Sequence, residues 1–134
     1  MSYSDKLYIG CPVQYVRQFI AGKWQMGILW NLKGEPLSFG EIKNLLPEVS
    51  DKMLMQELNF FVEKQIVVRE VIPFPTQRTQ YRLSHIGNSL IPIITAIVNW
   101  GYEHIQEERV NTAMSKTPFS IIANIENSMP SEKE

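Results

Sequence analysis

Apolar side chains recur every three or four positions over residues 11–33, which predicts two consecutive helices in this part of the chain. Pro12 suits the first position of a helix, because the N–H that it lacks would have no helical partner there. Gly22 is suited to ending the first helix, and Gly34 and Pro36 end the second. The apolar stripe of the first helix consists of Val13, Val16, Phe19 and Ile20.

Two shorter helices with a brief connection are predicted next. Ser38 and Glu41 have the spacing of a capping box, so a helix begins there, and it ends at Pro47. Ser50 is a second N-cap candidate and opens a helix from about residue 51 to 64, whose buried stripe is Leu54, Leu58 and Phe61. Two amphipathic helices joined by so short a connection are typical of a helix-turn-helix.

The pattern then changes to that of strands. Residues 67–72 are rich in β-branched side chains, and residues 78–83 alternate between polar and apolar, so the two segments predict a β-hairpin. Ser84 is a further N-cap candidate, and it leads one long helix that extends to about Glu108. The apolar residues of this helix cover more than one stripe.

This order of elements predicts a mainly α (α+β) fold, a winged helix-turn-helix with added N- and C-terminal dimerisation helices. Residues 1–10 form an N-terminal extension, residues 11–109 the domain, and residues 110–134 a loosely ordered tail rich in Ser, Asn, Thr and Pro. In such a fold, one helix of the pair enters the major groove of DNA and the hairpin reaches phosphate or the minor groove.

Composition narrows the classes of function. The 134 residues are 44% hydrophobic, and 13 basic against 14 acidic side chains leave a net charge of -1, which excludes a polybasic nucleic-acid coat. The chain shows neither a membrane-spanning apolar stretch nor a signal-peptide layout, so we expect a cytoplasmic protein without membrane partners. The single cysteine excludes an intrachain disulfide and a multi-cysteine zinc site.

No catalytic or metal-binding motif is evident. His85 and His104 have no carboxylate or cysteine at metal-ligand spacing, and the sequence holds no nucleophile elbow or phosphate-binding loop. We therefore expect no metal, no cofactor and no enzyme activity. A thiol enzyme that uses Cys11 would need a nearby base, and the sequence offers none.

The chain resembles the HxlR-type winged helix-turn-helix transcriptional regulators of bacteria, relatives of the MarR group. The resemblance covers about residues 11–108 and is carried by Cys11-Pro12-Val13, Gly22-Lys23-Trp24, Phe39-Gly40-Glu41-Ile42, Leu46-Pro47, Ser50, Met53-Leu54, Leu58, Arg78, Tyr81, Leu83-Ser84, Gly87, Leu90, Pro92 and Trp100-Gly101. It implies a DNA-binding regulator. The chain departs from the family pattern at Met55, where a small hydroxyl is common, and at Asn59, where a basic residue is usual.

The candidate DNA contacts lie on the second helix of the pair and on the hairpin. Gln and Asn pair with adenine, Lys bonds guanine or phosphate, and Arg enters a narrow minor groove or clamps phosphate. For each of these side chains, the alternative is an ordinary solvated surface. The candidates are Ser50, Lys52, Met55, Gln56 and Asn59 on the helix, Arg78 and Arg82 on the hairpin, and Lys23, which also fits an ordinary helix-start lysine.

Cys11 precedes Pro12 at a predicted helix N-terminus, where the helix dipole favours the reactive thiolate. The resemblance implies sensing of oxidants or electrophiles, because several family members use a thiol at this position for that purpose. The alternative is a small buried apolar side chain, as most lone cysteines are. The sequence does not identify any small-molecule effector.

The surplus of apolar residues on the terminal helix predicts a homodimer. Left exposed, they would form a larger apolar patch than a monomer normally tolerates. The expected interface residues are Val13, Val16, Phe19, Ile94, Ile97, Val98, Trp100 and Ile105. A two-fold dimer places two recognition helices about 34 Å apart, so the expected partner is double-stranded DNA with an imperfect palindromic operator.

A second function remains open at this point: a winged-helix module for protein interaction, with weak or no DNA binding. Met55 and Phe60 on a helix that should be polar, and the missing basic residue at Asn59, favour it.

Overall fold

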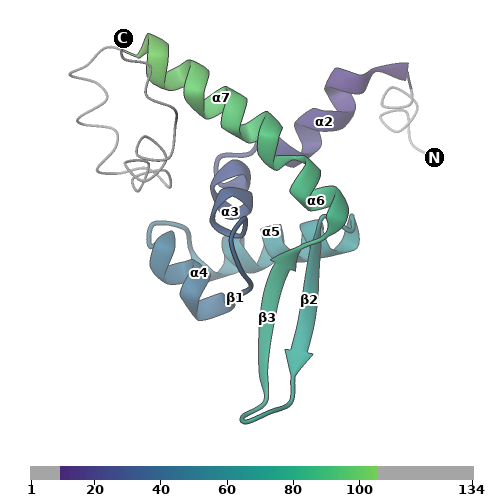
Figure 1. Ribbon diagram of the computed structural model, residues 1–134, viewed down its shortest axis with the longest axis vertical. Coiled ribbons are helices and arrows are strands. Elements are labelled where there is room, and N and C mark those ends of the chain that lie inside the picture. Colours follow the sequence, from purple (N-terminus) through teal and green to yellow (C-terminus); the bar gives the residue numbers. More distant parts are fainter. Residues whose placement is uncertain (1–9, 106–134) are drawn as a thin grey trace.

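The computed structural model describes residues 10–105, and the elements follow the predicted order. Three helices and the base of a small sheet form the body, the β2–β3 hairpin projects from one side, and two helical arms, α2 and α7, diverge from the opposite side (Figure 1). The elements are α2 (Pro12–Ile20), α3 (Gln25–Asn31), β1 (Leu37–Ser38), α4 (Phe39–Leu45), α5 (Asp51–Glu63), β2 (Val67–Ile72), β3 (Arg78–Leu83), α6 (His85–Ser89) and α7 (Ile91–His104).

The sheet has the strand order β1-β3-β2, and both strand pairs are antiparallel. The hairpin register runs from Val67 opposite Leu83 to Ile72 opposite Arg78, which confirms both predicted strands. β1 adds a third strand, with Leu37 opposite Tyr81. The sequence did not predict β1, because a strand of two residues has no hydrophobic period.

The core lies where the helices of the body meet the base of the sheet. The predicted inner stripe of α5 is confirmed, since Leu54, Leu58 and Phe61 have no exposed surface. Ser38 and Ser50 cap α4 and α5 as predicted, and the Ser38–Glu41 capping box is complete. The helix stripe packs with Ile28, Leu29, Ile42, Leu46, Val49 and Ile94.

The prediction of one long helix after the hairpin was wrong. α6 ends at Ser89 and α7 begins at Ile91, with Leu90 between them. Pro92 lies in the first turn of α7. Because proline has no N–H and its ring clashes with the carbonyl four residues earlier, it belongs at a helix start and not in a helix interior. α7 therefore leaves the body as a separate arm.

One buried polar side chain joins three helices. Gln25, at the start of α3, is 7% exposed. Its Oε1 accepts from the backbone N–H of Gly22 at 2.8 Å, and its Nε2 donates to the carbonyl of Gln18 in α2 at 2.8 Å and to Glu57 of α5 at 3.4 Å. These partners satisfy the amide, as its burial requires. Gln25 thus fixes α2 against α5.

The base of the hairpin is tied closely to α6. The Ser84 hydroxyl lies 2.7 Å from the carbonyl oxygen of Gln65, and the backbone N–H of Ser84 donates to the carbonyl of Ile66 at 3.0 Å. One helical turn later, Gly87 is buried against Ile66, the residue directly before β2. A Cβ at Gly87 would lie 2.1 Å from the Ile66 carbonyl oxygen, so only glycine allows this approach.

Replacing Gly87 with alanine should lower the free energy of unfolding by about 1–3 kcal/mol, the usual cost of overpacking. The methyl group would meet backbone, so α6 would have to shift. Gly40→Ala in α4 is the matched control, because a Cβ there would lie 4.0 Å from Ser38 Oγ, an ordinary contact distance. Urea unfolding at one protein concentration measures both variants. Equal stability of the two would contradict the close approach.

Candidate nucleic-acid interface

The helix pair α4–α5 is fastened at its turn. Lys43 of α4 donates from Nζ to the carbonyls of Pro47 and Val49, and the same ammonium lies 3.6 Å from the carboxylate of Asp51. Val49 is fully buried beneath the turn. The first turn of α5 is therefore held firmly against α4, and the outward face of α5 has a defined direction.

The outward face of α5 carries the residues that the sequence predicted. Lys52, Met55, Gln56 and Asn59 are all exposed, opposite the buried stripe. Lys52, Gln56 and Asn59 follow at spacings of four and three residues, so they form one row along the helix. Ser50 is exposed at the start of this row, and its hydroxyl accepts from the backbone N–H of Met53 at 3.0 Å.

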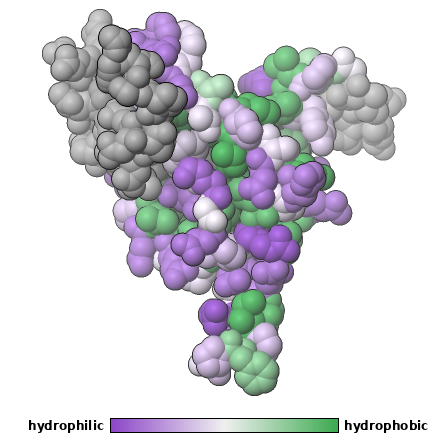
Figure 2. All heavy atoms as spheres, viewed as in Figure 1, coloured by the Kyte–Doolittle hydropathy of each residue, from purple (hydrophilic) through white to green (hydrophobic). Residues whose placement is uncertain are grey.

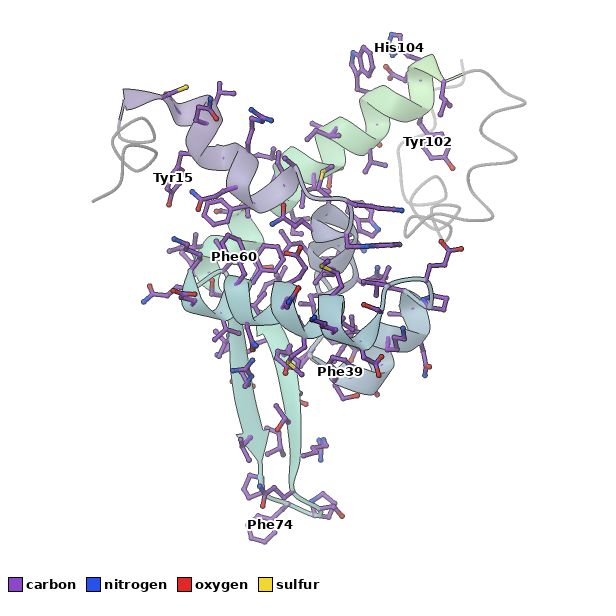
Figure 3. The ribbon with its side chains drawn as sticks, turned by 180° about the vertical axis from the view of Figure 1, so that it is seen from behind. Tyr15, Phe39, Phe60, Phe74, Tyr102 and His104 are labelled. Carbon is purple, nitrogen blue, oxygen red and sulfur yellow. The ribbon has the colours of Figure 1, made fainter. Side chains whose placement is uncertain are left out.

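The two hairpin arginines have different surroundings. Arg78 is exposed next to the tip, where Phe74 is 79% exposed and points away from the body (Figure 3). Arg82 lies nearer the base, and its Nε donates to Glu70 of β2 at 2.8 Å. This hydrogen bond holds the pKa of the Glu70 carboxyl below its ordinary value. Arg82 thus already has a carboxylate partner, whereas Arg78 shows no ion pair within the described residues.

Lys23 and Phe60 are not part of the row. Lys23 is in the corner between α2 and α3, with its Nζ 5.1 Å from the ring centroid of Trp24. Phe60 is half-buried, and its ring centroid lies 6.0 Å from that of Phe19, between α5 and α2 (Figure 3). Phe60 therefore packs the arm onto α5, which removes one reason for the protein-interaction alternative.

Sequence reasoning missed Arg69 of β2. Its Nη2 donates to Asn59 Oδ1, its Nε donates to the Tyr81 hydroxyl at 3.4 Å, and its Cζ lies 5.4 Å from the Tyr81 ring centroid. The alternation of side chains between the two faces of the hairpin could have shown which face Arg69 takes. Arg69 pairs with Tyr81 across the sheet, so both side chains share the face that packs toward α5.

The two arms expose apolar surface. Val13 of α2 is 67% exposed, and Ile97 and Trp100 of α7 are 41% and 65% exposed. Ile105 is exposed as well, while Val16 and Val98 are half-buried. Figure 2 shows hydrophobic surface between the arms and at the tip of the hairpin.

The expectation that Phe19 and Ile94 face a partner was wrong. Phe19 is 4% exposed and Ile94 is fully buried, and both belong to the core of the chain itself. Each residue lies on the inner side of its arm, near the point where the arm leaves the body. A helical stripe that is apolar on two sides does not show which side the core takes.

Cys11 is the N-cap of α2, as its position before Pro12 predicted. The thiol is half-buried, and its Sγ accepts from the backbone N–H of Gln14 at 3.4 Å. Residues 10–105 hold no cluster of three or more His, Cys, Asp or Glu side chains suited to a metal ion. Over the same residues, every helix is too short or too polar to cross a membrane. The predicted N-terminal extension, apart from Gly10, and the predicted tail lie outside the described residues.

The helix pair with its projecting hairpin defines a winged helix-turn-helix protein, mainly α with a β wing. Residues 19–109 match the model of the HxlR-like helix-turn-helix family, and the chain belongs to this family. An HTH-type transcriptional regulator of Methanothermobacter thermautotrophicus is 35% identical over 91 residues, which span 68% of this chain and 70% of that protein.

Two solved structures of regulators share the fold. The redox regulator HypR in its oxidized form has 27% identity and a TM-score of 0.67, with 72% of this chain and 99% of that chain covered. The reduced transcriptional regulator YodB from Bacillus subtilis has 26% identity and a TM-score of 0.65, with 72% and 95% covered. The protein is thus a transcriptional regulator of the helix-turn-helix type, as these relatives are described to be.

Proposed function

We propose that the protein is a cytoplasmic, homodimeric regulator that binds double-stranded DNA at an imperfect palindromic operator. The observation that carries this proposal is the exposed row Lys52, Gln56 and Asn59 on α5, a helix whose opposite face is completely buried. Lys52 offers a cation and Gln56 an amide, which are the chemistry of major-groove reading. The hairpin extends beyond the body beside it and carries Arg78 toward the flanking backbone or minor groove (Figure 1).

The dimer is proposed to form through the arms α2 and α7. Both arms extend from the side of the body opposite the hairpin (Figure 1), and their exposed apolar residues are Val13, Ile97, Trp100 and Ile105. A second copy that covers them would bury apolar surface and leave both hairpins and both α5 helices open to DNA. Such an interface is isologous, which is why the operator should be nearly palindromic.

Cys11 is proposed to make the regulator responsive to oxidants or electrophiles. The thiol lies at the positive end of the α2 dipole, on the arm proposed for dimer contact. Two of the structural relatives support this proposal by their descriptions, HypR as a redox regulator and YodB as a reduced form. With one cysteine in the chain, a protein disulfide of this regulator must join two chains.

Lys52→Ala and Arg78→Ala should each weaken binding to an operator obtained by selection from random duplexes. Loss of one phosphate contact reduces the salt slope of binding by about one, and loss of a base contact relaxes specificity at one position. Lys64→Ala is the matched control, because Lys64 caps the other end of α5 and its Nζ lies 6.0 Å from the Phe60 ring centroid, outside the row. Unchanged operator affinity in both test variants would refute the assigned interface.

Sedimentation equilibrium at low micromolar concentration should give the mass of a dimer. Ile97→Glu should give a folded monomer, since it places a carboxylate in the apolar contact. Val71→Glu is the control, because Val71 is an exposed apolar residue on the hairpin, away from the arms. Circular dichroism checks that both variants fold. A wild-type chain that sediments as a folded monomer would refute the dimer.

Cys11→Ser should bind the operator as well as the wild type does, but lose any response to diamide or benzoquinone. Diamide takes up two electrons and two protons as two thiols form one disulfide, so non-reducing electrophoresis should show a covalent dimer for the wild type alone. Benzoquinone adds to the thiolate without a second cysteine, and mass spectrometry detects that adduct. A wild type whose DNA binding ignores both reagents would contradict sensing by Cys11.

A further inference from the structure

A guanidinium group lies beside the exposed row of α5, and it comes from the hairpin rather than from the helix. We propose that Arg69 binds the DNA backbone and that Asn59 is the positioning residue that holds it there. The proposal rests on DNA binding by α5 and the hairpin, as set out above. It assigns the two residues different roles, although both lie at the same place.

Arg69 retains its charge for a partner outside the chain. The ion pairs among residues 10–105 are Lys43 with Asp51 and Arg82 with Glu70, so the described residues give Arg69 no carboxylate. Its protein partners are neutral oxygens, those of the Asn59 amide and the Tyr81 hydroxyl. An exposed guanidinium held only by neutral groups is suited to an anion, and the anion nearest to any helix in a DNA groove is phosphate.

The contacts also hold the guanidinium in a fixed position. Asn59 Oδ1 accepts from Nη2, the Tyr81 hydroxyl accepts from Nε, and Cζ lies over the Tyr81 ring, 5.4 Å from its centroid. Arginine has five N–H donors, so Nη1 and the second hydrogen of Nη2 stay available for phosphate oxygens. A side chain that is already ordered loses less conformational freedom on binding.

The same geometry changes the role of Asn59. Bidentate pairing with adenine needs both the acceptor and the donor of a side-chain amide. In this structure the Asn59 oxygen already accepts from Arg69, which ties the amide to the hairpin. Asn59 therefore orients the arginine instead of reading a base, and base reading on α5 falls to Lys52 and Gln56.

The position suits phosphate because Arg69 bridges the two DNA-facing elements. It belongs to β2, it contacts α5 through Asn59, and Asn59 is one turn beyond Gln56 in the row. When α5 lies in a major groove and the hairpin lies over the adjacent strand, the junction between them faces the sugar-phosphate wall of the groove. A backbone contact at this point fixes the register of both elements without carrying sequence information.

The test compares operator and random-sequence duplexes over a range of salt concentrations. Arg69→Gln should weaken binding to both by the same factor, about tenfold, and reduce the salt slope by about one. Lys64→Gln is the control, a cation at the far end of α5 whose Nζ lies 6.0 Å from the Phe60 ring centroid, outside the row. It should leave the salt slope unchanged. Arg69→Lys should keep the slope and lose part of the affinity, because lysine retains the charge without the planar fork.

Asn59→Ala should weaken binding to all sequences by a few fold, and the double variant with Arg69→Gln should be no weaker than Arg69→Gln alone. A readout without DNA separates positioning from base contact. Because Asn59 accepts from Nη2, the Nη2–H resonances of Arg69 should be sharp and slow to exchange with solvent in the wild type, and broadened in Asn59→Ala.

Any one of three results would overturn the inference. The salt slope of Arg69→Gln could be unchanged, or Asn59→Ala could weaken binding only to operators with adenine at one position. The third is a double variant whose loss of binding free energy equals the sum of the two single losses. Failure of the proposed function itself looks different, since the wild type would then show no salt-dependent DNA binding. Thermal unfolding of each variant confirms that the compared proteins are folded.

Discussion

The buried amide of Gln25 is the contact on which the arrangement of the helices depends. Its three hydrogen bonds reach the α2–α3 corner, the end of α2 and the side of α5, so a single side chain sets the angle between the arm and the exposed helix. Leaving a buried polar group without its hydrogen-bond partners costs about 1–3 kcal/mol. Loss of the Gln25 amide would leave its partner groups on α2 and α5 without that hydrogen bond. The contact between Phe19 and Phe60 adds apolar packing to the same joint.

The contacts of Gln25 and Phe60 connect the arm that carries Cys11 to α5, the helix proposed to read DNA. Cys11 caps the start of α2, and the carbonyl of Gln18 near its end accepts from Gln25. One continuous helix therefore joins the thiol to the Gln25 contact. At 1.5 Å per residue, the helix separates them by roughly 10 Å. A displacement of the arm at the thiol would reach α5 through Gln25 and Phe60. If Cys11 responds to oxidants as proposed, these contacts are the path by which its chemistry would alter the orientation of α5.

The sequence predicted those features that depend on neighbours along the chain. The serine caps at 38, 50 and 84 and the bounds of both hairpin strands were correct, since capping and β alternation are local. The break at Leu90 was missed, although Pro92 was its signal. The burial of Phe19 and Ile94 and the contact between Arg69 and Asn59 depend on how distant elements pack, which periodicity does not encode. The row on α5 was therefore predictable, whereas for Arg69 the hairpin period gives its face of the sheet but not its contact with Asn59.

The contact of Arg69 with Asn59 and Tyr81 is the point about which the hairpin would rotate relative to α5. Beyond it, Val71 and Phe74 are exposed, so that part of the wing gains little support from the body. Each strand residue adds about 3.3 Å, so the tip at Phe74 lies about 16 Å from Arg69. A rotation of about 5° about the Arg69 contact would therefore move the tip by about 1.4 Å. Small changes at Asn59 are thus magnified at the far end of the wing. Where the exposed tip meets DNA would therefore depend on how Asn59 holds Arg69 near the middle of the hairpin.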